Sequence, residues 1–183
     1  MLVLKKQYYL YLKNTKDFDL KSIKKRFKFT IIYNPKKIQE KFEDLLRFRN
    51  YCKSRSIKFL VGNDNKLCTK LKADGLYISS YKNEIIYSYH SKIGSAHNFK
   101  ELNRKYIQGC NRIVMSRLFE TNYKNKKGHY GLIKFNANYS DGIIALGGIR
   151  MNNINKLKLL KAEFIGILSE IKKKPANIIS RLF

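Results

Sequence analysis

Gly142-Ile-Ile-Ala-Leu-Gly-Gly-Ile149 is a short apolar run that ends in small residues, and Ala162-Glu-Phe-Ile-Gly-Ile-Leu-Ser169 has the same character about twenty residues later. Such runs are typical of strands that are buried on both faces. Small residues at their ends let backbone N–H groups approach a ligand closely. A tandem pair of these units near the C-terminus predicts the phosphate site of a (β/α)8 barrel, which lies in the loops after the seventh and eighth strands.

Further apolar runs precede this pair, and together they predict eight strands. Helical patterns separate most of the runs, and the clearest one, at 38–55, places Ile38, Phe42 and Leu45 near one face. Alternating strands and helices indicate a parallel sheet, and eight units indicate a closed barrel. The predicted strands are 8–12, 27–33, 58–62, 75–80, 92–96, 112–119, 142–148 and 163–169, and the other predicted helices are 65–72, 98–108 and 152–161.

The chain has 183 residues, whereas about 250 are typical of a (β/α)8 barrel. Segment 81–91 is rich in Tyr and Ser and has no helical face, so we expect a loop or a single turn in place of the fourth helix. Pro175 should end a last helix that starts near Ser169, and a second short helix is expected over 175–183. The length predicts one barrel domain over residues 1–183.

The composition predicts a globular protein without a membrane span. The chain is 44% hydrophobic, which is enough for a core, and it has no apolar run of about 18 residues or more. The apolar run after Met1 is too short for a secretory signal. Cys52, Cys68 and Cys110 show no C-x-x-C spacing, so we expect reduced thiols in a cytoplasmic protein.

The charge of the chain is strongly positive. Lys and Arg number 39 against 13 Asp and Glu, which gives a formal net charge of +26. Such a charge attracts anions, so phosphorylated ligands, nucleic acid and anionic membranes are all partners to consider. The cations are spread over the whole chain, which is typical of a solvated surface. We therefore expect phosphorylated small molecules as partners and no membrane, while the charge leaves nucleic acid open.

Four segments at or near the ends of predicted strands carry polar residues or glycines in a definite order. They are Gly62-Asn-Asp64 followed by Lys72-Ala-Asp-Gly-Leu-Tyr-Ile78, then Gly94-Ser-Ala-His97, then Phe119-Glu-Thr-Asn-Tyr-Lys124, and finally Ala145-Leu-Gly-Gly-Ile149 with Ile167-Leu-Ser169. Together they resemble the thiamine phosphate synthase and thiazole tautomerase superfamily over residues 8–171. The resemblance implies a (β/α)8 barrel that condenses hydroxymethylpyrimidine diphosphate with thiazole phosphate, giving thiamine phosphate and diphosphate.

The resemblance also implies a set of site residues. The implied catalytic residues are Lys124, Ser95 and His97. The implied substrate and phosphate ligands are Lys37, Asn63, Thr121, Gly147, Gly148, Ser169 and Lys82. Asp64 matches a metal-binding aspartate, and a carboxylate suits Mg²⁺, which also contacts substrate phosphates. An aspartate at this position is equally suited to cap the helix that follows it.

Several positions depart from the superfamily pattern. In the second-strand motif Gln-x-Arg-x-Lys, Lys37 remains, but Tyr33 replaces the Gln and Pro35 replaces the Arg. Lys82 replaces the second metal-binding Asp. A proline cannot make the bidentate contact that an arginine makes with diphosphate. Either the barrel has lost diphosphate chemistry, or Lys82, Lys37, Lys124 and Arg117 neutralise the diphosphate with less need for Mg²⁺.

Three hypotheses about function remain open at this level, and they differ on whether the chain is an enzyme at all. The first is a thiamine phosphate synthase-like transferase that acts on phosphorylated small molecules with Mg²⁺. The second is a thiazole tautomerase-like isomerase that uses His97 as an acid or base. The third is a catalytically inactive barrel that binds a phosphorylated ligand or nucleic acid, which the charge of +26 supports.

Overall fold

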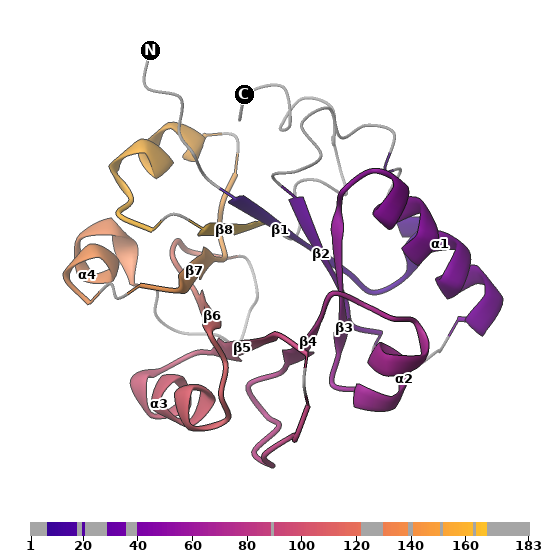
Figure 1. The fold of residues 1–183 in the computed structure, drawn as a ribbon. Coiled ribbons are helices and arrows are strands. Elements are labelled where there is room, and N and C mark those ends of the chain that lie inside the picture. The colour runs from indigo at the N-terminus through magenta and orange to yellow at the C-terminus, as the bar shows by residue number, and fades with distance from the viewer. Residues whose placement is uncertain are drawn as a thin grey trace.

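Eight parallel strands form a closed barrel, in which consecutive strands pair and β8 pairs with β1. In this computed structural model the strands form a central ring and the helices lie outside it (Figure 1). The strands are β1 Gln7–Leu12, β2 Phe29–Tyr33, β3 Lys58–Gly62, β4 Gly75–Ile78, β5 Lys92–Ala96, β6 Arg112–Ser116, β7 Ile143–Leu146 and β8 Phe164–Ile167. The structure describes residues 7–17, 20, 29–35, 40–88, 90–121, 130–138, 141–150, 152–162 and 164–167.

The helices follow several of the strands, as a (β/α)8 barrel requires. They are α1 Phe42–Ser54, α2 Asn65–Lys70, α3 Phe99–Ile107 and α4 Gly131–Ala137, with short 3₁₀ helices η1 Thr15–Asp17 and η4 Ile154–Leu159. Asn98 begins α3 by accepting a hydrogen bond from the Glu101 N–H at 2.9 Å. Among the described residues, no helix is both long and apolar enough to cross a membrane.

The predicted barrel is confirmed, and each predicted strand overlaps an observed one. β3 and β5 have the predicted bounds. The strand predicted at 142–148 ends earlier, at Leu146, because the chain turns at Gly147 and Gly148, whose φ angles are +101° and +69°. The strands predicted at 75–80 and 112–119 also end earlier, at Ile78 and Ser116.

The helices agree less well with the sequence pattern. The helix predicted at 152–161 is the 3₁₀ helix η4. The sequence does not predict α4, because this helix has only seven residues and Phe135 is its one buried side chain, too little to show a helical period. The helices expected from Ser169 and over 175–183 lie outside the described residues.

The connection between β4 and β5 contains no helix at the described residues 79–88 and 90–91. Figure 1 shows it as a loop that leaves the ring between β4 and β5. This is the segment for which the sequence predicts a loop in place of the fourth helix.

Apolar side chains fill two concentric layers, which explains why the strands are almost continuously apolar. The inner layer lies within the barrel, and the outer layer lies between the strands and the helices. The inner layer contains Tyr9, Ile32, Leu60, Tyr77, Ile93, Val114 and Ile144. At one end of this inner layer the guanidinium of Arg112 donates a hydrogen bond to the Tyr9 hydroxyl at 3.0 Å and lies 4.4 Å from the centre of the Phe164 ring.

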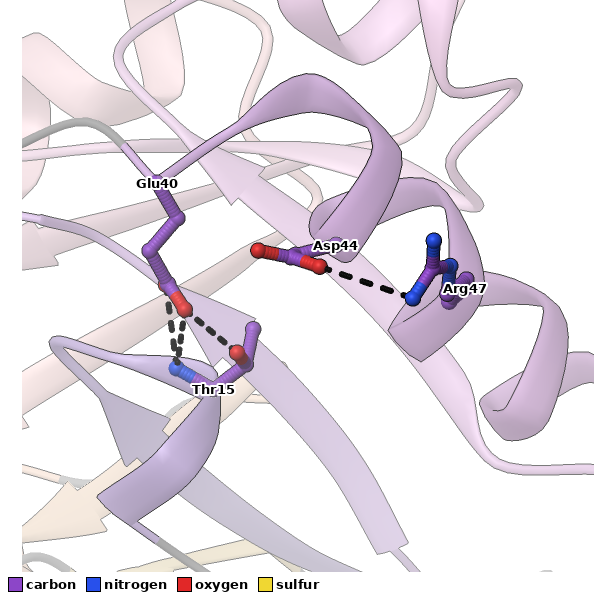
Figure 2. A network of polar contacts seen from close by, with 4 residues as sticks. All are labelled: Thr15, Glu40, Asp44 and Arg47. Carbon is purple, nitrogen blue, oxygen red and sulfur yellow. Dashed lines mark hydrogen bonds and ion pairs between the residues drawn. The ribbon is translucent and has the colours of Figure 1, made fainter.

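Glu40 ties the loop after β1 to the segment before α1 (Figure 2). Its carboxylate accepts hydrogen bonds from the Thr15 N–H at 3.0 and 3.2 Å and also from the Thr15 hydroxyl. Figure 2 also shows Asp44 and Arg47, which lie one turn apart on α1 with 3.9 Å between the charged atoms. The Arg47 side chain is 81% exposed and that of Asp44 is 44% exposed, so this ion pair contributes little to stability.

The net charge leads to a prediction about ionic strength. At least 26 of the 39 cationic side chains have no acidic residue left to pair with, since only 13 are present. Their mutual repulsion destabilises the compact state. Raising NaCl from about 0.01 to about 0.1 M shortens the Debye length from roughly 30 to roughly 10 Å. We therefore expect the free energy of unfolding, measured by urea titration, to rise by on the order of 1 kcal/mol. A flat or falling midpoint over this range would contradict the prediction.

Candidate functional site

The described residues that were predicted to form the site lie at the carboxyl ends of strands β3 to β7. Because the strands are parallel, these ends share one face of the barrel. Asn63 and Asp64 follow β3, Lys82 lies beyond β4, Ser95 and His97 lie at the end of β5, Thr121 lies beyond β6, and Gly147 and Gly148 follow β7. Lys37, Lys124 and Ser169 lie outside the described residues.

Asn63 is at the centre of a hydrogen-bond network on this face. Its Oδ1 accepts from the Ser79 N–H at 2.9 Å, and its Nδ2 donates to Ser79 Oγ at 2.8 Å, to the Tyr81 hydroxyl at 3.1 Å and to Asn34 Oδ1 at 3.3 Å. Its φ of +59° is a left-handed conformation that Asn adopts more readily than most side chains. The network joins the ends of β2, β3 and β4 through uncharged groups.

Two phenol groups lie further into the barrel, next to this network. The rings of Tyr11 and Tyr77 meet edge to face, with centroids 5.4 Å apart. The hydroxyl of Tyr77 hydrogen-bonds to Ser95, and that of Tyr11 accepts from Asn34 Nδ2. Burial raises the pKa of both phenols, so both are neutral at physiological pH. The part of the site that these two phenols line is therefore polar but uncharged.

The end of β2 differs from the sequence expectation by one residue. Tyr33, expected at the position of the superfamily's Gln, is fully buried in the outer layer and stacks on Phe59 with ring centroids 6.2 Å apart. The next residue, Asn34, is the one that reaches Asn63 and Tyr11. Successive strand residues point to opposite faces, so a shift of one residue exchanges the inward and outward side chains. An amide is thus present at the end of β2 after all.

Asp64 caps a helix, which is the role that the sequence offers as the alternative to metal binding. It is the N-cap of α2, and its Oδ1 accepts a hydrogen bond from the Leu67 N–H at 2.9 Å. The part of the chain that the structure describes holds no group of three or more His, Cys, Asp or Glu that could bind a metal ion. The described residues therefore do not fit a magnesium site held by the protein alone.

Two substitutions at Asp64 separate the helix cap from the effect of the carboxylate charge. Asp64→Asn keeps an oxygen that accepts from Leu67, so we expect stability to change by less than about 0.5 kcal/mol, whereas Asp64→Ala should cost about 1 kcal/mol. Thermal unfolding of the two variants measures this difference. Equal losses for both variants would mean that the carboxylate charge, and not the cap, is what stabilises this region.

His97 and Ser116 form a pair between the ends of β5 and β6. The Nδ1 of His97 lies 2.6 Å from Ser116 Oγ. The backbone of His97 is fixed on both sides, since its N–H donates to Glu101 at 2.8 Å and its carbonyl accepts from the Tyr130 hydroxyl at 3.0 Å. Within the part of the chain that the structure describes, the ring is held through Nδ1, so Nε2 is the nitrogen suited to exchange a proton with a ligand.

The turn after β7 packs against the chain that follows β6. The Leu118 N–H donates to the Leu146 carbonyl at 2.9 Å, and the Phe119 N–H donates to the Gly147 carbonyl at 3.0 Å. The side chain of Arg117 lies next to Gly147 and donates to Thr121 Oγ1 at 3.4 Å. The sequence predicts that backbone N–H groups of this turn hold a phosphate. The Cβ and Cγ atoms of Arg117 lie beside the turn, and its guanidinium lies next to Thr121.

Comparison with known families fits this geometry. The family model described as thiamine monophosphate synthase matches residues 20–171, which is most of the chain. The chain belongs to the thiamine monophosphate synthase family.

Individual relatives agree with this assignment. The thiamine-phosphate synthase of Pelagibacter ubique (strain HTCC1062) is 30% identical over 149 residues, which cover 74% of this chain and 72% of that protein. That of Bacillus cereus (strain B4264) is 28% identical over 144 residues, covering 70% and 65%. That of Prochlorococcus marinus (strain AS9601) is 26% identical over 142 residues, covering 73% of this chain but only 40% of the relative. The chain therefore spans less than two thirds of some relatives that it matches.

Solved structures give the same fold. Thiamine phosphate pyrophosphorylase from Pyrococcus furiosus superposes over 100% of both chains with a TM-score of 0.69 and 15% identity. The pyrophosphorylase from Bacteroides thetaiotaomicron covers 92% of this chain and 85% of its own, with a TM-score of 0.64 and 15% identity. At these identities the likeness concerns the barrel alone.

Several residues of the site in this family member were missed by sequence reasoning. They are Asn34, Ser79 and Tyr81 in the Asn63 network and Ser116 beside His97. Alternation along the strands would have found two of them, because Asn34 is two residues beyond the inward-facing Ile32 and Ser116 is two beyond Val114. No sequence signal marks Tyr81, which is in the loop that replaces the fourth helix.

Proposed function

We propose that this chain is a thiamine-phosphate synthase. The thiazole nitrogen of thiazole phosphate forms a bond to the methylene carbon of hydroxymethylpyrimidine diphosphate, and the carbon–oxygen bond to diphosphate breaks with its electron pair leaving on the diphosphate. The observation that carries the proposal is the cluster of predicted residues at the carboxyl ends of β3 to β7, in a chain that belongs to this family.

Each part of the site has a role in this reaction. Gly147, Gly148 and Ser169 hold the thiazole phosphate through backbone N–H groups. Asn63 and Ser95 hydrogen-bond to the substrates. The departing diphosphate gathers negative charge as the bond breaks, so cations placed beside it lower the barrier more than a general base would.

The proposed cations are three lysines and one arginine. Lys124, Lys37 and Thr121 contact the diphosphate, and Arg117 and Lys82 add positive charge. The exchange of the second metal-binding Asp for Lys82 supports a smaller dependence on Mg²⁺ than other family members have. A Lys82→Asp variant that gains Mg²⁺-dependent turnover would support this part of the proposal, and unchanged behaviour would contradict it.

The test of the proposal is product formation. The purified protein is incubated with hydroxymethylpyrimidine diphosphate and thiazole phosphate, with and without Mg²⁺, and thiamine phosphate is assayed. We expect turnover that falls by about 100-fold or more in Lys124→Ala, since removing one group that stabilises developing charge has an effect of this size. Lys134→Ala, which changes an exposed lysine on α4, is the control. No turnover under either condition would contradict the proposal and favour a non-catalytic barrel that binds a phosphorylated ligand or nucleic acid.

A second candidate activity is favoured by the contact between His97 and Ser116. With Nδ1 fixed at 2.6 Å from the serine hydroxyl, the imidazole would accept a proton from one atom of a thiazole substrate and return a proton to a carbon atom of the same molecule, which is a tautomerisation. Tautomerisation in D₂O that introduces deuterium, and that is lost in His97→Asn while thiamine phosphate formation persists, would support it. Loss of both activities together would argue against a separate role for His97.

The family reaction acts on phosphorylated small molecules, and we propose that it takes place in the cytoplasm. Cys52, Cys68 and Cys110 are all unpaired and buried, which is consistent with a reducing compartment.

A further inference from the structure

Lys105 on α3 is fully buried, although lysine is among the residues least often found there. Its Nζ donates hydrogen bonds to the Ser79 carbonyl at 2.7 Å, to the Lys82 carbonyl at 2.7 Å and to Gln108 Oε1 at 2.8 Å. An ammonium group has three N–H donors, so these three neutral acceptors satisfy all of them. Burial lowers the pKa of Lys105.

The chain makes room for this side chain. A Cβ atom at Gly94 on β5 would lie 2.9 Å from both Cγ and Cδ of Lys105, so any larger residue there would collide with its stem. Glycine at this position therefore lets the lysine pass between α3 and the strand and reach the loop beyond β4.

The acceptors belong to the loop that replaces the fourth helix. Gln108, one turn further along the chain, donates through Nε2 to the Lys82 carbonyl at 3.1 Å and to the Glu84 carbonyl at 2.8 Å. Two side chains from the α3 region thus bind three backbone carbonyls between residues 79 and 84. In a usual barrel a helix after the strand would order this segment, and here Lys105 and Gln108 do so.

The same loop supports the candidate site from the other side. The Ser79 carbonyl accepts a hydrogen bond from Lys105. The Ser79 N–H donates to Asn63 Oδ1 at 2.9 Å, and Ser79 Oγ accepts from Asn63 Nδ2 at 2.8 Å. Ser79 is 4% exposed, so the chain of hydrogen bonds from Lys105 to Asn63 is shielded from water. A shift of Ser79 would move the amide of Asn63 with it.

We infer that Lys105 is a positioning residue, which fixes Ser79 and thereby the side chain of Asn63 at the mouth of the barrel. The part of this inference that concerns substrate rests on the proposed function, whereas the part that concerns the loop does not. Lys105 does not touch the substrates. It sets the geometry of groups that bind them, so its loss should raise KM for hydroxymethylpyrimidine diphosphate more than it lowers kcat.

The first experiment measures amide hydrogen exchange in Lys105→Ala and Lys105→Met. The Ser79 N–H binds Asn63 Oδ1, and the Lys82 N–H donates to the Ser79 carbonyl at 3.0 Å. Both amides should exchange at least about tenfold faster in the variants, which is the effect of losing one buried hydrogen bond to a charged donor. The Leu67 amide, bound to Asp64, should not change. Lys100→Ala, at an exposed lysine of the same helix, is the matched control.

The second experiment is chemical rescue. Lys105→Ala removes three methylene groups and the ammonium, and n-propylammonium has the same four heavy atoms. Added n-propylammonium should restore slow exchange at Ser79 and lower KM again, whereas 1-propanol, which has a similar size and no charge, should not. Rescue by both compounds would show that filling space, and not the ammonium, is what matters, and this would overturn the inference.

Two further outcomes would also overturn the inference. Unchanged exchange at Ser79 and Lys82 in both variants would show that Lys105 does not fix the loop. Faster exchange with unchanged KM would show that the loop does not position Asn63. If the unaltered protein makes no thiamine phosphate, the proposed function fails, but the exchange and rescue experiments still decide whether Lys105 holds Ser79.

Discussion

Gly148→Ala should destabilise the barrel by about 3 kcal/mol and lower thiamine phosphate formation at least tenfold. A Cβ atom at this position would lie 2.4 Å from the Phe119 carbonyl oxygen and 2.5 Å from that of Glu120. Both are backbone atoms, so relief requires the turn after β7 to move away from the chain after β6, which costs about 1–3 kcal/mol. The φ of +69° adds about 1–2 kcal/mol for any residue with a Cβ. Urea unfolding and the synthase assay measure the two effects.

Gly131 provides a matched control for this prediction. Its φ is +66°, close to that of Gly148, but a Cβ atom there would meet no atom of the described residues within 4 Å. Gly131→Ala should therefore cost only the conformational part, about 1 kcal/mol. If the two substitutions cost the same, the close approach of the two chain segments does not contribute, and the turn is looser than its contacts indicate.

Asn63→Asp should cost about 2 kcal/mol at neutral pH and reduce substrate binding. The substitution keeps the shape and the oxygen that accepts from the Ser79 N–H, but it removes the two N–H donors that Ser79 Oγ, the Tyr81 hydroxyl and Asn34 Oδ1 share. Each lost hydrogen bond costs about 0.5–1.5 kcal/mol, and the new carboxylate would face the Asn34 oxygen without a proton between them. Equilibrium unfolding and titration with hydroxymethylpyrimidine diphosphate measure the losses.

The pH dependence of this variant adds a second check. A protonated carboxyl has one O–H donor, so the folded protein favours the protonated form and the pKa of the new carboxyl is raised above the unfolded value of about 4. The deficit relative to the unaltered protein should therefore shrink as the pH falls toward about 4. Asn111→Asp is the control, because its Nδ2 makes an exposed contact with Ser91 Oγ at 3.3 Å. A deficit in Asn63→Asp that does not change with pH would show that the lost donors are not its cause.

The barrel could be predicted because each of its strands can be recognised from a short stretch of sequence. Each strand is a short apolar run, and the number and order of the runs restrict the fold to a closed parallel sheet. The location of the site follows from this fold, because all parallel strands have their carboxyl ends on the same face of the barrel. This is why Asn63, Ser95, His97 and the two glycines after β7 could be placed together from the sequence.

The partners of these residues could not be predicted in the same way. The contact between His97 and Ser116 depends on the register of β5 against β6, in which Ala96 pairs with Met115. At the end of β2, Asn34 and not Tyr33 faces the site, which is a shift of one residue. The apolar pattern of a strand that is buried on both faces does not tell which residues face inward. Lys105 is one lysine among many, and its burial depends on a loop whose shape no local pattern determines.

The closure of the ring by β1 and β8 has a consequence for how the chain is made. Tyr9 pairs with Gly166, and its hydroxyl accepts from Arg112, 103 residues later. Until the last strand has left the ribosome, β1 keeps a row of unpaired backbone groups, which is a template for pairing with another chain. Contacts so distant in sequence also form slowly. The period between synthesis of β1 and arrival of β8 is therefore when this protein is most open to aggregation, and a chaperone that shields the edge of β1 would act at that stage.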